Sequence, residues 1–392
     1  MFEMQEEIEK SRHGKMEKLG KYIQEYTVKN KCAESIPVYS VTNTQGFCKD
    51  YFGKEVASKD KTTYKIVPKG YFAYNPSRIN VGSVDWQRNE ERVIVSPLYN
   101  VFSVSEQLNQ QYLYYYLKSD IVRQFIKAIA RGTVRDNLKL SMLCEFPIYV
   151  PSVLEQENIV VKLDGLQKVI NLRKQQLQKL DELIQARFVE MFGDPVLNEK
   201  GWRRKPLLDM GNCKNGMNFH YDDCGVEINC LGVGDFKDLS IIDNTEQLPT
   251  VSLKEMPSEE YLLKDDDVVF VRSNGNKTLV GRSVAVYPGE VATTFSGFCI
   301  RYRKYDEEIR IPYLLRVLKT DSIRRKMTGR GANIQNLNQQ ILSNLLIPVP
   351  PIELQNQFAG FVNQVNKSKV EIQQALEKTQ LLFDSLMQQY FG

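Results

Sequence analysis

The strongest constraint on this chain is an internal repeat, in which ordered motifs recur at an offset of 199 residues. The motif R-G-x-x-x-x-N-L begins at Arg131 and again at Arg330. From these arginines to the Phe-Gly pairs at residues 192–193 and 391–392, the offset holds without a gap. Such an ordered series indicates a tandem duplication, so the fold must contain two similar units, each stabilised by the same kinds of element.

The repeat extends upstream with a looser match. Residues 117–123 read L-K-S-D-I-V-R, and residues 318–324 read L-K-T-D-S-I-R. Residues 95–98 align with residues 295–298, and the branched and aromatic content of both segments favours strands. The duplication therefore covers the globular parts of the chain as well as the segments that follow them.

After a short proline-bearing segment, each copy contains a long stretch of heptad periodicity. Apolar residues alternate at steps of three and four, proline precedes each stretch and glycine ends it, as expected for a long helix with one apolar seam. The predicted seam consists of Ile159, Leu163, Leu166, Ile170, Leu177, Leu180 and Ile184 in the first copy, and of Phe358, Val362, Val365, Ile372, Leu376, Phe383 and Leu386 in the second.

A long helix with one apolar stripe needs a partner to cover that stripe. Each helix packing on its own globular part is one solution, but two seams of equal length and register favour pairing of the helices with each other. We therefore predict an α+β fold with an internal pseudo-twofold repeat, in which two similar globular domains are separated by an antiparallel two-helix coiled coil. The predicted boundaries are 1–150 for the first domain, with an N-terminal extension, 151–193 for the first helix, 194–349 for the second domain and 350–392 for the second helix.

Cysteine usage and charge exclude several classes of protein. The seven cysteines include no C-x-x-C pair, so we expect reduced thiols in the cytoplasm and no metal or other cofactor. Cys213, Cys224 and Cys230 with His220 form the one conceivable metal set, and their spacing matches no zinc module. The charged N-terminus lacks a signal peptide, and no apolar run approaches the ~20 residues of a membrane span. The net charge of +4 permits nucleic-acid binding without requiring it.

Polar turns rich in arginine and asparagine lie between the predicted strands of both domains, at residues 75–80 and 272–277. Arginine and lysine donate to guanine, and asparagine pairs with adenine, while further basic residues meet phosphates. The alternative is that Asn-Gly turns are only turns and that basic runs are solvated faces. The predicted DNA-binding residues are Asn75, Ser77, Arg78, Asn80, Arg123, Arg131, Arg135, Arg272, Ser273, Asn274, Asn276, Lys277, Arg282, Arg324, Arg325 and Arg330.

With these features the sequence resembles the specificity subunits of type I restriction-modification systems, over nearly the whole chain. The resemblance is carried by the duplicated order of variable domain, R-G-x-x-x-x-N-L, proline segment, heptad helix and Phe-Gly, and by the run Asp267–Gly275. It implies that each domain is a target recognition domain for one half of a split double-stranded DNA site. It also implies that the helices dock two modification subunits, which methylate adenine with S-adenosylmethionine, and that a restriction subunit supplies ATP-driven cleavage. The segment from Met1 to Lys15 has no counterpart before the second domain.

Two other functions fit parts of the sequence. A DNA methyltransferase would need a glycine-rich cofactor loop and an Asn/Asp-Pro-Pro-aromatic turn; Tyr74–Ser77 lacks the second proline and the aromatic residue, and Leu231–Asp235 lacks the third glycine of a dinucleotide fingerprint. Gly275–Thr278 resembles the end of a phosphate loop without its first glycine, and two distant histidines do not support a catalytic triad. A coiled-coil scaffold that binds only proteins would leave the arginine and asparagine turns without a role. Salt dependence of binding separates such a scaffold from a protein that contacts phosphates.

Overall fold

The computed structural model describes residues 16–49, 60–130, 137–219, 225–236, 240–276, 278–305, 307–328 and 336–392. The chain divides into two compact units: unit 1 contains residues 1–174 and 374–392, and unit 2 contains residues 175–373. Within the described part of the chain, no helix combines the length and apolarity that a membrane span requires.

Unit 1 is built on a four-stranded antiparallel sheet with the order β2–β9–β6–β7. These strands are β2 (Ile23–Glu25), β9 (Asn100–Val104), β6 (Phe72–Tyr74) and β7 (Val84–Trp86). The remaining strands form the pairs β1 (Glu17–Lys18) with β10 (Pro147–Ile148), β3 (Ser40–Thr42) with β4 (Gly46–Cys48), and β5 (Lys65–Pro68) with β8 (Arg92–Val95). The core includes the stacked rings of Phe72 and Phe102, whose centroids lie 5.1 Å apart.

Three short helices complete unit 1: α2 (Gln110–Lys118), α3 (Asp120–Ala130) and α4 (Leu140–Leu143). α2 begins after Asn109, because the side-chain oxygen of Asn109 accepts hydrogen bonds from the backbone N–H groups of Gln111 and Tyr112. The 3-10 turns η1 (Leu19–Lys21) and η2 (Ile79–Val81) connect strands.

Unit 2 has a five-stranded sheet with the order β12–β19–β16–β17–β14; the described pairings of this sheet are antiparallel except for the parallel pairing of β14 with β17. Its strands are β12 (Gly211–Asn215), β19 (Cys299–Lys304), β16 (Asp267–Val271), β17 (Ser283–Val286) and β14 (Ile241–Ile242). A second sheet contains β15 (Thr250–Leu253), β13 (Val226–Leu231) and β18 (Thr293–Phe295), and β11 (Arg204–Pro206) pairs with β20 (Leu346–Pro348). The 3-10 turns are η3 (Leu207–Asp209), η4 (Val233–Asp235), η5 (Thr245–Gln247) and η6 (Glu259–Tyr261).

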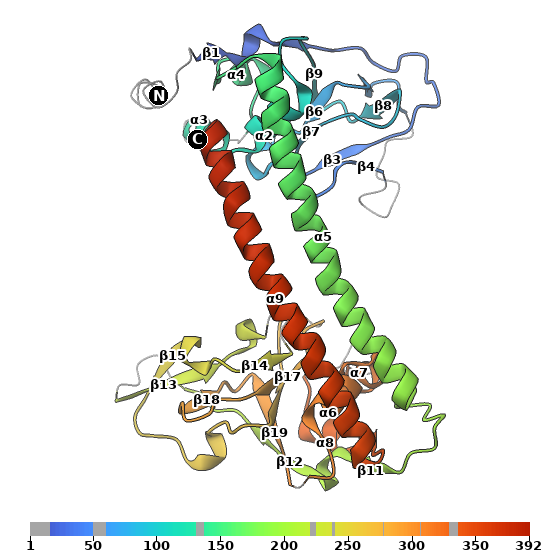
Figure 1. Ribbon diagram of the computed structural model, residues 1–392, viewed down its shortest axis with the longest axis vertical. Helices are drawn as coiled ribbons and strands as arrows, with labels where there is room; N and C mark the ends of the chain where they lie inside the picture. Colours follow the sequence, from blue (N-terminus) through green and yellow to red (C-terminus); the bar gives the residue numbers. More distant parts are fainter. Residues whose placement is uncertain are drawn as a thin grey trace. The chain divides into compact units, whose positions relative to one another are not determined.

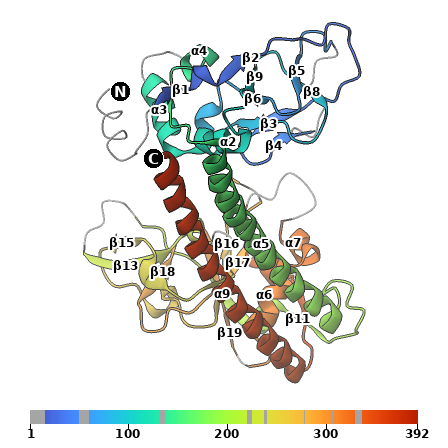
Figure 2. The same ribbon diagram turned by 45° about the horizontal axis from the view of Figure 1, so that its top comes forward.

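The short helices of unit 2 occur in the same order along the chain as those of unit 1. They are α6 (Ile311–Lys319), α7 (Asp321–Thr328) and α8 (Gln339–Ser343). α6 packs beside β17, and Figures 1 and 2 both show this helix next to the sheet. The four-stranded order of unit 1 corresponds to β12–β19–β16–β17 of unit 2, so the two halves share their central architecture.

The strands expected at residues 95–98 and 295–298 are largely replaced by turns in the structure. β18 ends at Phe295 and β19 begins at Cys299, and a turn closed by a hydrogen bond from the N–H of Cys299 to the carbonyl of Ser296 (2.8 Å) lies between them. β8 likewise ends at Val95, before a turn in unit 1. A Ser-Gly-Phe or Ser-Pro-Leu sequence between apolar residues is compatible with both a strand and a turn, and the glycine or proline decides in favour of the turn.

Two continuous helices of 40 residues each, α5 (Val153–Phe192) and α9 (Ile352–Phe391), contribute to both units. At ~1.5 Å per residue, each is about 60 Å long. In unit 1 the beginning of α5 pairs with the end of α9, because the guanidinium of Arg173 donates to the hydroxyl of Thr379 and the ammonium of Lys162 lies 3.5 Å from the hydroxyl of Tyr390. The two helices are therefore antiparallel there; Figure 1 draws α5 in green and α9 in red.

In unit 2 the end of α5 pairs with the beginning of α9. The ammonium of Lys369 donates to the carboxylate of Asp181 (2.7 Å), and the rings of Phe188 and Phe358 lie 5.7 Å apart. All residues of the predicted seam are buried or half-buried. The predicted fold class, α+β with two similar units and paired long helices, is confirmed.

Aromatic side chains attach the helix ends to the globular parts. In unit 1 the ring of Phe391 lies 5.0 Å from that of Tyr112 on α2, and in unit 2 the ring of Phe192 lies 4.7 Å from that of Tyr313 on α6. The helices thus pack on the globular parts at their ends as well as on each other. The two solutions that the sequence left open are combined.

A buried glutamine repeats at the start of each long helix. The amide of Gln156 donates to the carbonyl oxygens of Gln107 (2.9 Å) and Pro151 (2.8 Å) and accepts from the N–H of Asn109 (2.8 Å). Gln355 makes the corresponding bonds in unit 2, to Glu308, Pro350 and Arg310. Both glutamines are fully buried, so these bonds replace those with water and fix where each helix begins.

Candidate nucleic-acid interface

The polar loop of unit 1 follows β6 and is shaped by its own side chains. The side-chain oxygen of Asn75 accepts a hydrogen bond from the N–H of Ser77 (3.0 Å), and the carbonyl of Asn75 accepts one from the N–H of Arg78 (3.0 Å). Ile79 is buried and anchors the loop, while Ser77 and Arg78 are exposed and Asn80 is half-buried. The loop therefore presents a hydroxyl and a guanidinium group to solvent from a fixed backbone.

The polar loop of unit 2 follows β16, the strand that corresponds to β6. The guanidinium of Arg272 donates to the carbonyl of Gly297 (3.3 Å). The side-chain oxygen of Asn274 accepts from the N–H of Asn276 (2.7 Å), and that of Asn276 accepts from the N–H and the hydroxyl of Thr278. These amide oxygens shape the loop, and each asparagine also carries an NH2 group that can donate to other partners.

The end of the repeated R-G-x-x-x-x-N-L motif holds both loops in place. In unit 1 the N–H of Leu138 donates to the carbonyl of Pro76 (3.1 Å), and the hydroxyl of Ser77 donates to the side-chain oxygen of Asn137 (2.6 Å). In unit 2 the N–H of Leu337 donates to the carbonyl of Arg272 (2.8 Å). The same backbone bond thus supports loops of different sequence at equivalent places.

The basic residues predicted on the short helices have different surroundings. Arg123 on α3 is exposed and pairs with Asp120 at 3.2 Å, which is a weak surface ion pair. Arg324, its repeat counterpart on α7, is half-buried and donates to the carbonyl of Thr278 (3.1 Å), so it supports the loop of unit 2. Burial lowers the pKa of Arg324. Arg325 is exposed.

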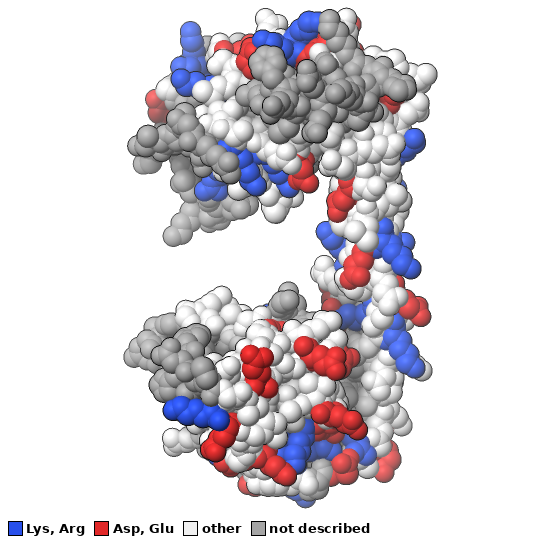
Figure 3. Space-filling view, turned by 90° about the vertical axis from the view of Figure 1, so that its left-hand side faces the viewer, with Lys and Arg blue, Asp and Glu red and all other residues white. Residues whose placement is uncertain are grey.

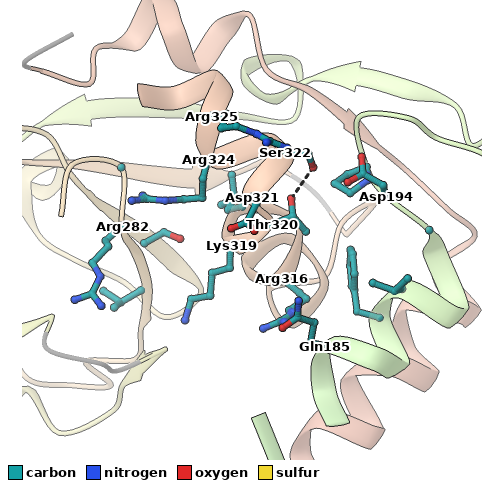
Figure 4. Close-up of a pocket in the computed structure, with 18 of the residues that line it drawn as sticks. Gln185, Asp194, Arg282, Arg316, Lys319, Thr320, Asp321, Ser322, Arg324 and Arg325 are labelled. Carbon is teal, nitrogen blue, oxygen red and sulfur yellow. Dashed lines mark hydrogen bonds between the residues drawn. The ribbon is translucent and has the colours of Figure 1, made fainter. Parts of the chain in front are cut away.

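A pocket of about 800 Å³ in unit 2 brings several of these cations together (Figure 4). Its lining includes Arg282 beside β17, Arg324 and Arg325 on α7, and the acidic residues Asp194 and Asp321. The sequence reasoning missed two further basic residues of the lining, Arg316 and Lys319 on α6.

Lys319 has a repeat counterpart in Lys118, at the end of α2. Burial, the largest cause in both cases, lowers the pKa of each lysine to about 8. Lys319 donates to the hydroxyl of Ser240 (2.5 Å), and Lys118 donates to the carbonyl of Gly82. Both lysines lie in the repeated L-K-[ST]-D segment, so the repeat is the sequence signal by which they could have been found.

Four of the predicted DNA-binding residues, Arg131, Arg135, Lys277 and Arg330, lie outside the described residues. His220 and Cys224 of the conceivable metal set do so too, and no group of three or more possible metal ligands occurs in the part that the structure describes. Acidic and basic side chains are mixed over the visible surface of both units (Figure 3).

The comparisons with known proteins agree on one family. The sequence profile of the type I restriction modification DNA specificity domain matches residues 7–182 and 200–381. The type I restriction enzyme StySPI specificity subunit of Salmonella potsdam is 24% identical over 304 residues, which cover 72% of this chain and 65% of that subunit, slightly less than two thirds of its length. The MjaIX specificity subunit of Methanocaldococcus jannaschii is 22% identical over 342 residues, covering 82% of this chain and 77% of that subunit.

Two solved structures have a similar fold. One is a chain from a structural study of complex assembly and conformational transition of the type I R-M system. Its TM-score is 0.58 at 17% identity, and the match covers 97% of this chain and 98% of that chain. The other is the S subunit of a type I restriction-modification system from M. genitalium, with a TM-score of 0.56, 16% identity and coverage of 96% of both chains.

Proposed function

We propose that each unit reads one half of a bipartite DNA target, because the chain belongs to the family of type I restriction-modification specificity subunits and carries the DNA specificity domain twice. The observation that carries the proposal is the pair of equivalent loops after β6 and β16. Both are fixed by a backbone bond from the Leu of the repeated motif, and their exposed side chains differ. A common support with different polar side chains suits the recognition of two different base sequences.

In this proposal the paired helices set the spacing between the two half-sites and dock two modification subunits. Those subunits bring S-adenosylmethionine and methylate adenine, and a restriction subunit joins through the complex. The names of the relatives, which are specificity subunits of type I restriction enzymes, support this assignment of partners.

The chain itself supplies no chemistry in this proposal. The nearest match to a methyltransferase turn begins at Tyr74, which is fully buried. Its hydroxyl donates to the carbonyl of Leu138 (2.9 Å) and accepts from the amide of Asn100 (2.9 Å). These bonds give Tyr74 a structural role in supporting the loop, and leave it no access to a substrate base.

Methylome sequencing of a host that carries this chain with its modification subunits, compared with a host that lacks only this chain, tests the proposal. We expect a split motif that is adenine-methylated only when the chain is present. A motif that persists without the chain, or a contiguous motif, would contradict bipartite reading. Binding of S-adenosylmethionine to the purified chain alone, measured by calorimetry, would contradict the non-catalytic role.

A further inference from the structure

Two exposed apolar side chains lie in equivalent turns of the two units. Leu98 is 76% exposed and Phe298 is 62% exposed. Each is the third residue of a four-residue turn, closed by a bond from the N–H of Tyr99 to the carbonyl of Ser96 (3.1 Å) in unit 1 and by the Ser296–Cys299 bond in unit 2. Single exposed apolar residues are common on protein surfaces, so the recurrence at one place of the repeat is the informative feature.

Both turns lie against the polar loops. In unit 2 the carbonyl of Phe298 accepts hydrogen bonds from the N–H groups of Arg272 (2.8 Å) and Ser273 (3.3 Å). In unit 1 Leu98 lines a pocket of about 440 Å³ together with Asn75 and Ser77. In each unit, the exposed apolar side chain and the polar loop therefore form one continuous surface.

The turns hold these side chains in fixed positions. The N–H of Gly297 donates to the carbonyl of Met217 (2.7 Å), and a Cβ atom at Gly297 would lie 2.0 Å from the side-chain oxygen of Asn218, so a larger residue would require Asn218 to move. In unit 1 Pro97 occupies the corresponding position and fixes the backbone φ angle. A rigid turn limits the entropy lost when its side chain is covered by a ligand.

The surface matches the chemistry of base edges in the major groove of DNA. Each base pair there presents hydrogen-bonding atoms, and thymine adds an apolar methyl group beside them. We propose that Leu98 and Phe298 each contact a thymine methyl group, one in each half of the target, next to the polar contacts of the loops at 75–80 and 272–276. This inference rests on the proposed function.

The difference between the two turns favours DNA over a protein partner. Two copies of one partner protein docked on the two units would require like surfaces, whereas Pro97–Leu98 and Gly297–Phe298 differ in shape. Residues that read two different half-sites must differ, as the neighbouring loops also do.

The test uses the complex with its modification subunits and the target duplex identified by methylome sequencing. Each thymidine is replaced in turn by deoxyuridine, which removes only the methyl group. With the wild-type complex we expect one position in each half-site to lose affinity about four-fold, the size expected for one buried methyl group. Phe298→Ala should abolish the sensitivity in one half-site and keep it in the other, and Leu98→Ala should do the reverse.

Tyr305→Ala and Leu197→Ala, both in unit 2, serve as controls, because these residues are 63% and 69% exposed and lie outside the polar loop at 272–276 and the turn at 296–299. Both controls should keep the full pattern of deoxyuridine sensitivity. Sequence-specific binding that is insensitive to every deoxyuridine, or an unchanged pattern in Phe298→Ala and Leu98→Ala, would overturn the methyl contacts and leave the recognition role intact. Absence of any sequence preference in the wild-type complex would overturn both.

Discussion

Arg272 connects the polar loop of unit 2 to the turn that contains Phe298, because its guanidinium donates a hydrogen bond to the carbonyl of Gly297. We predict that Arg272→Ala weakens recognition of one half-site by about 1–3 kcal/mol, the value of a lost bidentate contact to a base. The measurement is a competition assay with duplexes mutated in one half-site at a time. Arg78→Ala is the matched variant in unit 1 and should affect the other half-site. Equal loss at both half-sites in either variant would refute independent reading by the two units.

The contribution of Lys319 to the free energy of unfolding should depend on pH. Burial lowers the pKa of Lys319 from its ordinary value of 10.5 to about 8. Between these pH values the unfolded chain binds more protons than the folded chain, so this residue makes the free energy of unfolding rise with pH across that window. Below pH 8 the buried charge opposes folding. We therefore expect Lys319→Met to raise the melting temperature at pH 7 and to lose that advantage as the pH approaches 10.5.

Scanning calorimetry of wild type and Lys319→Met from pH 7 to 10.5 checks this, since the other titrating groups contribute equally to both proteins. Lys118→Met should show the same trend, because the pKa of Lys118 is lowered to about 8 by the same cause. A stability difference that does not change with pH would show that the charge of Lys319 is well solvated in the folded protein.

At the scale of the elements, the pairing of α5 and α9 depends on a narrow seam. Ile170 is 1% exposed, whereas Leu172, two residues along the same helix, is 49% exposed. We predict that Ile170→Asp destabilises the protein by at least about 3 kcal/mol, because it removes a buried apolar side chain and leaves an unpaired charge in the seam. Leu172→Asp should change stability by less than about 0.5 kcal/mol. Thermal unfolding followed by circular dichroism distinguishes the two, and equal effects would argue against a seam at Ile170.

For the whole molecule, DNA binding should depend steeply on salt. A protein that neutralises several phosphates releases counterions, so the logarithm of its binding constant falls linearly with the logarithm of the salt concentration, at about −0.9 per phosphate contacted. For on the order of 6 phosphate contacts we expect a slope of about −5 for the complex on its target, which lowers the affinity about 1,000-fold between about 50 and 200 mM salt. Fluorescence anisotropy over this salt range measures the slope. A slope near zero would favour the protein-binding scaffold.

Much of the fold could be predicted from the sequence, because its strongest signals are periodic along the chain. The offset of 199 residues defined two similar units, and the heptad spacing placed helices at 151–193 and 350–392, close to the observed Val153–Phe192 and Ile352–Phe391. A heptad is recognised from residues three and four apart, and a repeat is recognised by comparing two segments of the sequence. Neither requires knowledge of which segments come into contact.

Only the tertiary structure decided how distant segments meet. It placed Leu138 against Pro76 and Leu337 against Arg272, which lie more than 60 residues apart along the chain, and it put the Phe298 turn beside the loop of unit 2. No local pattern specifies such contacts, because they depend on which strands become neighbours in the sheet. The sequence by itself determined the duplication, the long helices and the polar loops; the folded chain determined which side chains share a surface with those loops.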